Sequence, residues 1–268
     1  MILLIFEGVK EEPKIMQTVK ELFFKDNPDM VQCAYGSDTH TFVKEVKELQ
    51  EDGGEVDIFN VVKDRMNRRG DTSLNNFISS QFEATYLFFD YDPQNNTVSL
   101  SQLNEEISEI IDVLSDSSEN GMIFISYPMV ESLYCLNSMS DPNFSNYAVS
   151  IDQLHKGKSW AMEYDFYRKR HNIIFKTDKT GKIEEKDNTP ERVSSLKAMW
   201  NDLILVNTSK ANFICNDNYT APRYVEDITT KEIFIKQLKK YVSKDKNVPV
   251  LSAFPLFLFE YFHGNGDF

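Results

Sequence analysis

The sequence predicts an α/β protein whose mainly parallel sheet is covered by helices on both faces. Residues 1–8, 84–93 and 122–126 form three short apolar runs that stop at turn residues, as buried strands do. Segments with helical spacing of apolar residues separate these runs. This alternation of strands and helices is typical of a sheet built from βαβ units.

The segments between the three runs supply the other elements of this part. Residues 14–25 have apolar side chains at helical spacing, and Asn27 and Pro28 end the pattern. Residues 56–62 fit either a strand or a helix. The remaining predictions are a strand at 30–35, a helix at 39–50 with Thr39 or Thr41 as its cap, a helix at 74–81, an acidic helix at 100–114 and a short helix beginning at Pro128.

The pattern changes near residue 141, so we predict a strand-containing part at 1–140 and a mostly helical part at 141–268. Helical spacing recurs at 160–170, 191–213 and 231–243, and the polar segment 176–190 predicts an exposed loop or hairpin. The aromatic run at 254–259 fits a core segment, or else a surface that docks a partner or a second copy of the chain. We expect the second part to provide substrate, partner or dimer contacts.

The composition fits a folded protein of the cytoplasm. The chain has 268 residues, of which 41% are hydrophobic, enough to bury a sizeable core. Its N-terminal apolar run is too short for a signal peptide, and residues 248–262 fall short of the ~20 residues that cross a membrane. Its three cysteines are far apart and support neither a disulfide framework nor a zinc site.

Acidic side chains follow two of the predicted strands. Glu7 and Gly8 end the first apolar run, and Asp90 and Asp92 end the run that begins at Ala84. The carboxyl ends of parallel strands meet at one edge of a sheet, where ligands bind in open α/β folds. Carboxylates gathered there repel one another unless a cation neutralises them. An alternative for the two aspartates is a solvated corner between a strand and a loop.

The order of these motifs resembles the Toprim fold of topoisomerases, primases and the overcoming-lysogenization-defect (OLD) nucleases. The segment EGVKEEPKIMQTVKELF is similar to the opening of the RloB-type branch, although Glu11 stands where that branch has Thr. The segment ISYPMVESLYCL is similar to a later motif of the same branch and implies that Glu131 lies near the same edge. The resemblance covers residues 1 to about 136. It implies a Toprim-like sheet in an α/β protein.

If the strand-end acids share a site, the natural chemistry is metal-assisted hydrolysis of phosphodiester bonds. Mg²⁺ or Mn²⁺ held by Asp90 and Asp92 would polarise a phosphate oxygen and activate water, while Glu7 would hold a second metal or act as general base. Further candidate ligands are Glu11, Glu12 and Glu131. For Glu11 and Glu12, a competing interpretation is that they complement the dipole at the start of a helix.

The net charge of −13 means that nucleic acid can bind only where basic residues gather. One cluster comprises Lys63, Arg65, Arg68 and Arg69, and the other comprises Arg168, Lys169 and Arg170, which follow aromatic residues. Basic residues interleaved with aromatic ones suit a groove for nucleic acid. Both clusters also fit a solvated face that balances nearby acids.

We therefore expect a magnesium-dependent nuclease that cleaves RNA, including tRNA, with DNA as the second choice of substrate. The resemblance also implies an ABC-type ATPase partner and a role as toxic effector in anti-phage defence. The second hypothesis is a catalytically silent Toprim-like module that regulates a protein partner. A nucleotide-modifying enzyme is disfavoured because the chain has no glycine loop that would hold phosphates.

Overall fold

A five-stranded sheet forms the centre of the computed structural model, which describes residues 1–25, 29–51, 56–94 and 97–264. The strands lie in the order β2-β1-β3-β5-β4. Their bounds are Ile2–Phe6 for β1, Met30–Ala34 for β2, Ala84–Asp90 for β3, Ser115–Asp116 for β4 and Gly121–Ser126 for β5. Only β4 among these runs antiparallel to its neighbour, so the predicted α/β fold with a mainly parallel sheet is confirmed.

The strand register brings the carboxyl ends of β1 and β3 together. Phe6 pairs with Phe88, so Glu7 follows β1 beside the last residue of β3, which is Asp90. On the other side of β3, Asp90 pairs with Ser126 at the end of β5. The two strands are almost fully apolar because helices cover both of their faces.

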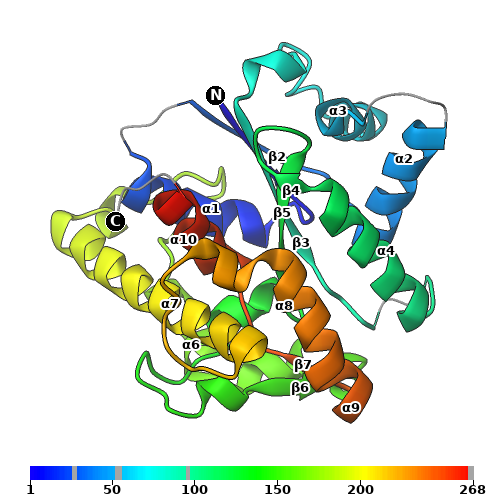
Figure 1. Cartoon of the computed structure of the whole chain (residues 1–268). Helices are drawn as coiled ribbons and strands as arrows, with labels where there is room; N and C mark the ends of the chain where they lie inside the picture. Colours follow the sequence, from blue (N-terminus) through cyan, green and yellow to red (C-terminus); the bar gives the residue numbers. More distant parts are fainter. Residues whose placement is uncertain (26–28, 52–55, 95–96, 265–268) are drawn as a thin grey trace.

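Helices α1 (Glu11–Phe23) and α10 (Ala253–Gly264) lie on one face of the sheet, and α2 (Thr39–Glu51) and α4 (Leu100–Val113) lie on the other (Figure 1). Side chains of β3 alternate between these layers, as a strand requires. The Phe88 ring stacks on Phe254 of α10 at 4.9 Å, whereas the Phe89 ring packs against Phe42 of α2, also at 4.9 Å.

The aromatic run near the C-terminus is a central part of the core. Phe254 and Phe257 of α10 are fully buried, and the Phe257 ring contacts Tyr86, Phe88 and Phe124 of the sheet. The core interpretation of this run is therefore confirmed. The last part of the chain thus covers the sheet formed by the first part, and one hydrophobic core includes residues of both.

The rest of the second half is mostly helical. Its longest helix, α7 (Pro190–Asn216), begins at the cap Thr189, whose hydroxyl accepts a hydrogen bond from the Arg192 N–H. The remaining elements are α3 (Ile58–Arg68) in the first half, then β6 (Ala148–Ser150), α5 (Ile151–Leu154), α6 (Asp165–Arg168), α8 (Thr230–Gln237), α9 (Ser243–Asp245) and β7 (Asn247–Pro249). Strands β6 and β7 pair antiparallel.

Buried Lys210 ties α7 to the segment before β6. Its ammonium group donates to the carbonyl oxygens of Phe144, Ser145 and Tyr147 at 3.1, 2.5 and 3.0 Å. These bonds satisfy both the lysine and three carbonyl groups away from solvent, where unpaired polar groups are costly.

Two helix predictions were wrong in detail. Residues 74–81 form turns with one short 3₁₀ helix, Ser79–Gln81, in place of a regular helix. Residues 160–170 are split between the 3₁₀ helix Gly157–Glu163, the single turn of α6 and the start of the 3₁₀ helix Arg170–Asn172. Residues 58–62, left open between strand and helix, begin α3 because the Asp57 side chain caps its first turn. Among the described residues, none of the helices has both the length and the apolar composition that a membrane span needs.

Candidate active site

Glu7 is fixed between β1, β3 and the start of α2. Its backbone N–H continues the sheet by donating to the Phe88 carbonyl at 2.9 Å. Its Oε2 accepts from the backbone N–H of Asp90 at 2.9 Å and lies 3.3 Å from the Thr39 hydroxyl, which also lies 3.1 Å from the Asp90 carbonyl oxygen. The structure therefore brings Glu7 and Asp90 together, as the strand pattern predicts.

Asp92 lies two residues beyond the end of β3 in a left-handed backbone conformation, with φ of 39°. Such a conformation is uncommon outside glycine and is tolerated best by Asn and Asp. The Asp92 N–H donates to the Pro128 carbonyl at 3.0 Å, which holds this turn against the end of β5. The Asp92 Oδ1 is buried and has no hydrogen-bond partner.

The first turn of α1 contributes Glu12, whose side chain is only 6% exposed. Its Oε1 accepts the backbone N–H of Gly8 at 3.0 Å. A Cβ atom at Gly8 would lie 2.6 Å from the Glu12 carboxylate oxygens, so glycine is needed for this approach. Neighbouring Glu11 accepts from the Tyr134 hydroxyl at 2.9 Å and lies 3.7 Å from the Arg170 guanidinium.

Glu131 enters the same region from the 3₁₀ helix Val130–Tyr134 that follows β5. Its side chain is buried, and its Oε1 forms an ion pair with the ammonium of Lys158. The other carboxylate oxygen, Oε2, is buried without a hydrogen-bond partner. Sequence reasoning missed Lys158, because it lies far from the motifs in the chain and no local pattern marks it.

The acids perturb one another's ionisation. Burial raises the pKa of Glu7 to about 8, and the charges of Glu12 and Asp92 also raise it, while the hydrogen bond from Asp90 acts in the opposite direction. Burial, followed by the charges of Glu7, Glu12 and Glu131, raises the pKa of Asp90 well above its ordinary value. Burial likewise raises the pKa values of Glu12 and Asp92. At neutral pH the cluster therefore retains protons unless a cation replaces them.

The donor set suits a hard divalent cation. Glu7, Glu12, Asp90, Asp92 and Glu131, which we call the acid cluster, supply carboxylate oxygens, the ligands that Mg²⁺ and Mn²⁺ prefer. The unpartnered oxygens of Asp92 and Glu131 are available as ligands. As the side chains stand, no three such groups in the described ranges converge on one point, so binding requires side chains to turn toward a common centre.

The first basic cluster is engaged within the molecule. Arg65 and Arg68 pair with Glu45 at 3.1 and 2.7 Å. Arg69 donates to the Tyr35 carbonyl at 2.7 Å, and Lys63 donates to the Phe77 carbonyl at 3.0 Å. These contacts give all four cations a structural role, and their predicted binding of nucleic acid stays a prediction.

The second basic cluster lies beside the elements that carry Glu12 and Glu131 of the acid cluster. The pairing of Arg170 with Glu11 and the contact between the rings of Tyr134 and Tyr167 bring this segment to the helix that carries Glu131. Arg168 pairs with Asp165 at 2.6 Å, and Arg170 lies over the Tyr167 ring. Arg170 and the Tyr167 ring thus lie next to Glu11, one residue from Glu12 of the acid cluster.

Comparison of the chain with protein-family models, with curated proteins and with solved structures finds no match. The functional interpretation therefore depends on the acid cluster and its surroundings.

Proposed function

We propose that this protein is a divalent-metal-dependent endonuclease of Toprim type that hydrolyses phosphodiester bonds. The observation that carries the proposal is that five poorly exposed carboxylates from β1, α1, β3 and the segment after β5 lie close enough for their charges to raise one another's pKa values. Among the described residues, Lys158 is the only cation within 4.0 Å of any of the five. Such a cluster costs stability in the absence of metal, and sites of this kind are often functional.

Each residue has a distinct part in the proposed reaction. Asp90 and Asp92 would hold the cation, which would stabilise charge on the phosphate and lower the pKa of water. Glu7 is positioned by Thr39 and by the Asp90 N–H, and it would hold a second cation or accept a proton from the attacking water. Glu12 and Glu131 would complete the ligand set, while Arg170, which lies 3.7 Å from Glu11, would contact a substrate phosphate.

Lys158 would have two states in this proposal. In the structure its ammonium neutralises Glu131, and its side chain is 56% exposed, so it can leave without disrupting the core. A bound divalent cation would take over this neutralisation and release Lys158 toward the substrate. The lysine would therefore compete with the metal for Glu131.

Lys158→Met should make metal binding tighter, by about threefold to tenfold, because the competing cation is removed while the aliphatic stem is kept. Isothermal titration calorimetry with MnCl₂ measures this change. Lys156→Met, on an exposed neighbour, is the matched control and should leave the affinity unchanged. Weaker binding by Lys158→Met would show that the lysine does not compete with the metal.

The substrate and partners in the proposal come from the family resemblance. RNA, including tRNA, is the favoured substrate and DNA the second, with an ABC-type ATPase as partner in anti-phage defence. The second half would contribute Arg168, Lys169 and Arg170 to substrate binding and could form a dimer. The cationic residues beside Glu11 support contact with a polyanion at this edge.

Cleavage assays test the proposal directly. Purified protein should cut tRNA or DNA in the presence of MgCl₂ or MnCl₂ and not in chelator, and Asp90→Asn should lower the rate by at least 10³-fold, since it removes a metal ligand. Glu105→Gln, an exposed acid on α4, is the control and should retain full activity. Equal cleavage by wild type and Asp90→Asn would reject the assignment, and metal binding without cleavage would favour the silent regulatory module.

A further inference from the structure

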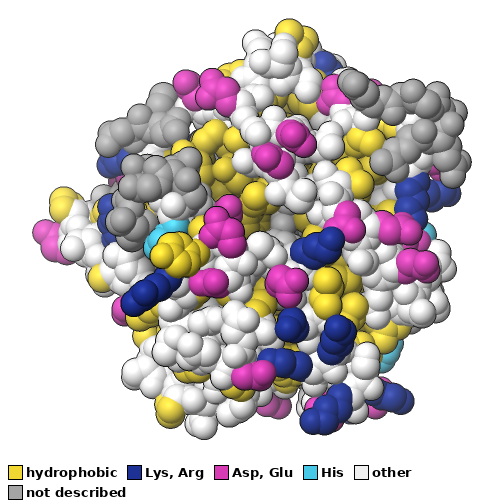
Figure 2. Space-filling model, in the orientation of Figure 1, with side chains coloured by type: hydrophobic (Ala, Val, Ile, Leu, Met, Phe, Trp, Pro, Cys, Tyr) yellow, Lys and Arg dark blue, Asp and Glu magenta, His cyan; other side chains and the backbone are white. Residues whose placement is uncertain are grey.

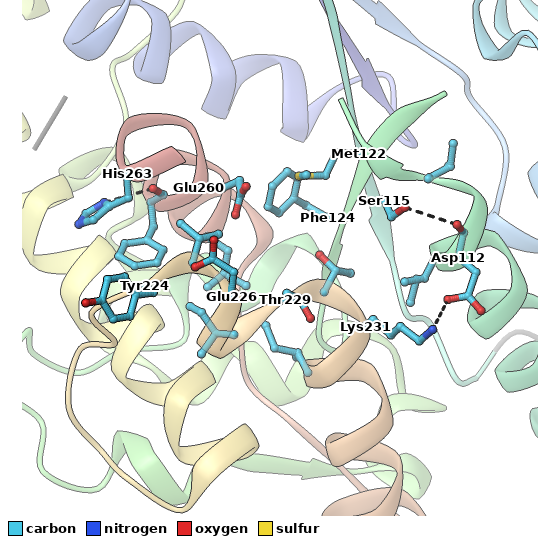
Figure 3. A pocket seen from close by; sticks show the side chains of 18 of the residues that line it. Asp112, Ser115, Met122, Phe124, Tyr224, Glu226, Thr229, Lys231, Glu260 and His263 are labelled. Carbon is cyan, nitrogen blue, oxygen red and sulfur yellow. Dashed lines mark hydrogen bonds and ion pairs between the residues drawn. The ribbon is translucent and has the colours of Figure 1, made fainter. Parts of the chain in front are cut away.

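A cavity lies away from the acid cluster, and none of the five acids lines it. Its volume is about 770 Å³, within the range of small-molecule sites. The wall is formed by β5, α4, α8 and α10 together with the 3₁₀ turn Val225–Ile228. The cavity is thus bounded by rigid elements from both halves of the chain (Figure 3).

The inner surface combines apolar and aromatic side chains. Met122 and Phe124 of β5 line the cavity together with Leu256 and Phe259 of α10. The Tyr224 side chain, which is 65% exposed, stands at the rim. An apolar floor binds the body of an organic ligand, and the faces of aromatic rings attract a positive group. These walls favour an organic molecule over a hydrated inorganic ion.

Two carboxylates give the cavity a negative charge. Glu260 of α10 and Glu226 of the 3₁₀ turn point into the cavity, and neither forms an ion pair with a described Lys or Arg (Figure 3). Burial and the charge of Glu226 raise the pKa of Glu260 to about 7. A third acid on the wall, Asp112, is already neutralised by Lys231 at 2.7 Å.

Other cations on this face do not reach the two carboxylates. Figure 2 shows Lys and Arg side chains gathered over α8 and α9, beyond the cavity. Arg223 and His263 also line the wall, but neither lies within 4.0 Å of Glu226 or Glu260. An anionic ligand would be repelled by the carboxylates, and a neutral apolar ligand would bury Glu260 further without compensation.

We propose that this cavity binds an organic cation, namely an amine or guanidinium group attached to an apolar body. The positive group would lie between Glu226 and Glu260 and near the rings of Phe124, Phe259 and Tyr224, and the apolar body would contact Met122 and Leu256. The ligand can be a free small molecule or a Lys or Arg side chain of a partner protein, since both present the same chemistry. This inference is independent of the proposed nuclease activity.

Methyl NMR of protein labelled at methionine tests the proposal, because Met122 lies in the cavity wall. Its signal is assigned with Met122→Leu. Phenethylamine should shift the Met122 signal with at least tenfold higher affinity than the neutral 2-phenylethanol or the anionic phenylacetate. The double variant Glu226→Gln/Glu260→Gln should lower phenethylamine affinity at least tenfold.

The control variant, Glu119→Gln/Glu185→Gln, removes the same amount of charge from exposed sites outside the cavity and should bind phenethylamine like wild type. The capped dipeptide acetyl-Phe-Lys-amide distinguishes the two possible ligands, a free small molecule and a Lys or Arg side chain of a partner protein. Tighter binding of the dipeptide identifies a partner protein's side chain, whereas tighter binding of phenethylamine identifies a small molecule. The proposal is overturned by an unshifted Met122 signal, by equal affinity for phenethylamine and 2-phenylethanol, or by a double variant whose affinity for phenethylamine equals that of wild type.

Discussion

Replacing Glu7 with Gln is expected to stabilise the metal-free protein and to abolish its metal-dependent cleavage. The amide oxygen of Gln can still accept from the Asp90 N–H and the Thr39 hydroxyl, while the charge opposed by burial and by neighbouring acids is removed. We expect the free energy of unfolding to rise by up to about 4 kcal/mol at pH 8 in chelator, because each tenfold change in proton affinity corresponds to about 1.4 kcal/mol. Loss of activity together with a gain of stability is the signature of a functional site.

The pH dependence of this effect has a defined sign. The pKa of Glu7 rises from an ordinary 4.5 to about 8 on folding, so the folded protein binds more protons than the unfolded chain between these values. The stability of the metal-free wild type should therefore fall as pH rises from 4.5 to 8. Glu7→Gln removes this contribution. The difference in free energy of unfolding between the variant and wild type should therefore increase as pH rises from 4.5 to 8.

Glu45→Gln is the matched control for that prediction. Glu45 accepts from the Tyr35 hydroxyl at 2.6 Å and pairs with Arg65 and Arg68, so its charge is compensated. The same substitution there should lower the free energy of unfolding. Denaturant melts in chelator at pH 5 and pH 8 measure both variants. A loss of stability in Glu7→Gln at pH 8 would mean that the Glu7 charge is structural.

Phe257→Ala should produce a large loss of stability. The ring is fully buried between α10 and the sheet. It contacts the rings of Tyr86 and Phe88 of β3, Phe124 of β5, Phe24 at the end of α1 and Tyr261 of α10 itself. Truncating such a side chain costs about 3 to 5 kcal/mol. Because one core joins the two halves, the variant should still unfold in a single transition, at a lower denaturant concentration.

Urea denaturation followed by tryptophan fluorescence and by circular dichroism measures this effect. Leu205→Ala provides the control, because Leu205 is 53% exposed on α7 and its truncation should change stability by less than about 0.5 kcal/mol. Two separate transitions in Phe257→Ala would show that residues 1–140 fold independently of residues 141–268.

The strand pattern was enough to predict the sheet and the meeting of Glu7 with Asp90. Apolar runs that end in acids fix both the buried strands and the edge at which their last residues lie. Core was one of the two interpretations of the late aromatic run, because a run of large apolar side chains favours burial. These features depend on local sequence, and the register of the strands in the sheet follows from them.

Other parts of the site depend on contacts between distant segments. The prediction of Thr39 or Thr41 as the cap of α2 was wrong, because Asp38 caps this helix by accepting the Thr41 N–H at 2.8 Å. The Thr39 hydroxyl lies at Glu7 instead, because α2 begins next to the end of β1. Lys158 reaches Glu131 from a 3₁₀ helix whose position depends on the whole second half. Similarly, the basic residues of α3 looked available for nucleic acid, and only the packing of α2 against α3 reveals their partner Glu45.

The central claim is that the acid cluster binds a divalent cation, and calorimetric titration of chelator-treated wild-type protein with MnCl₂ tests it most directly. We predict saturable binding below millimolar concentration, with an enthalpy that depends on the buffer, since the metal displaces protons held by Glu7 and Asp90. Asp90→Asn should lose this binding. No heat of binding up to millimolar MnCl₂, or the same binding curve in Asp90→Asn, would contradict the claim.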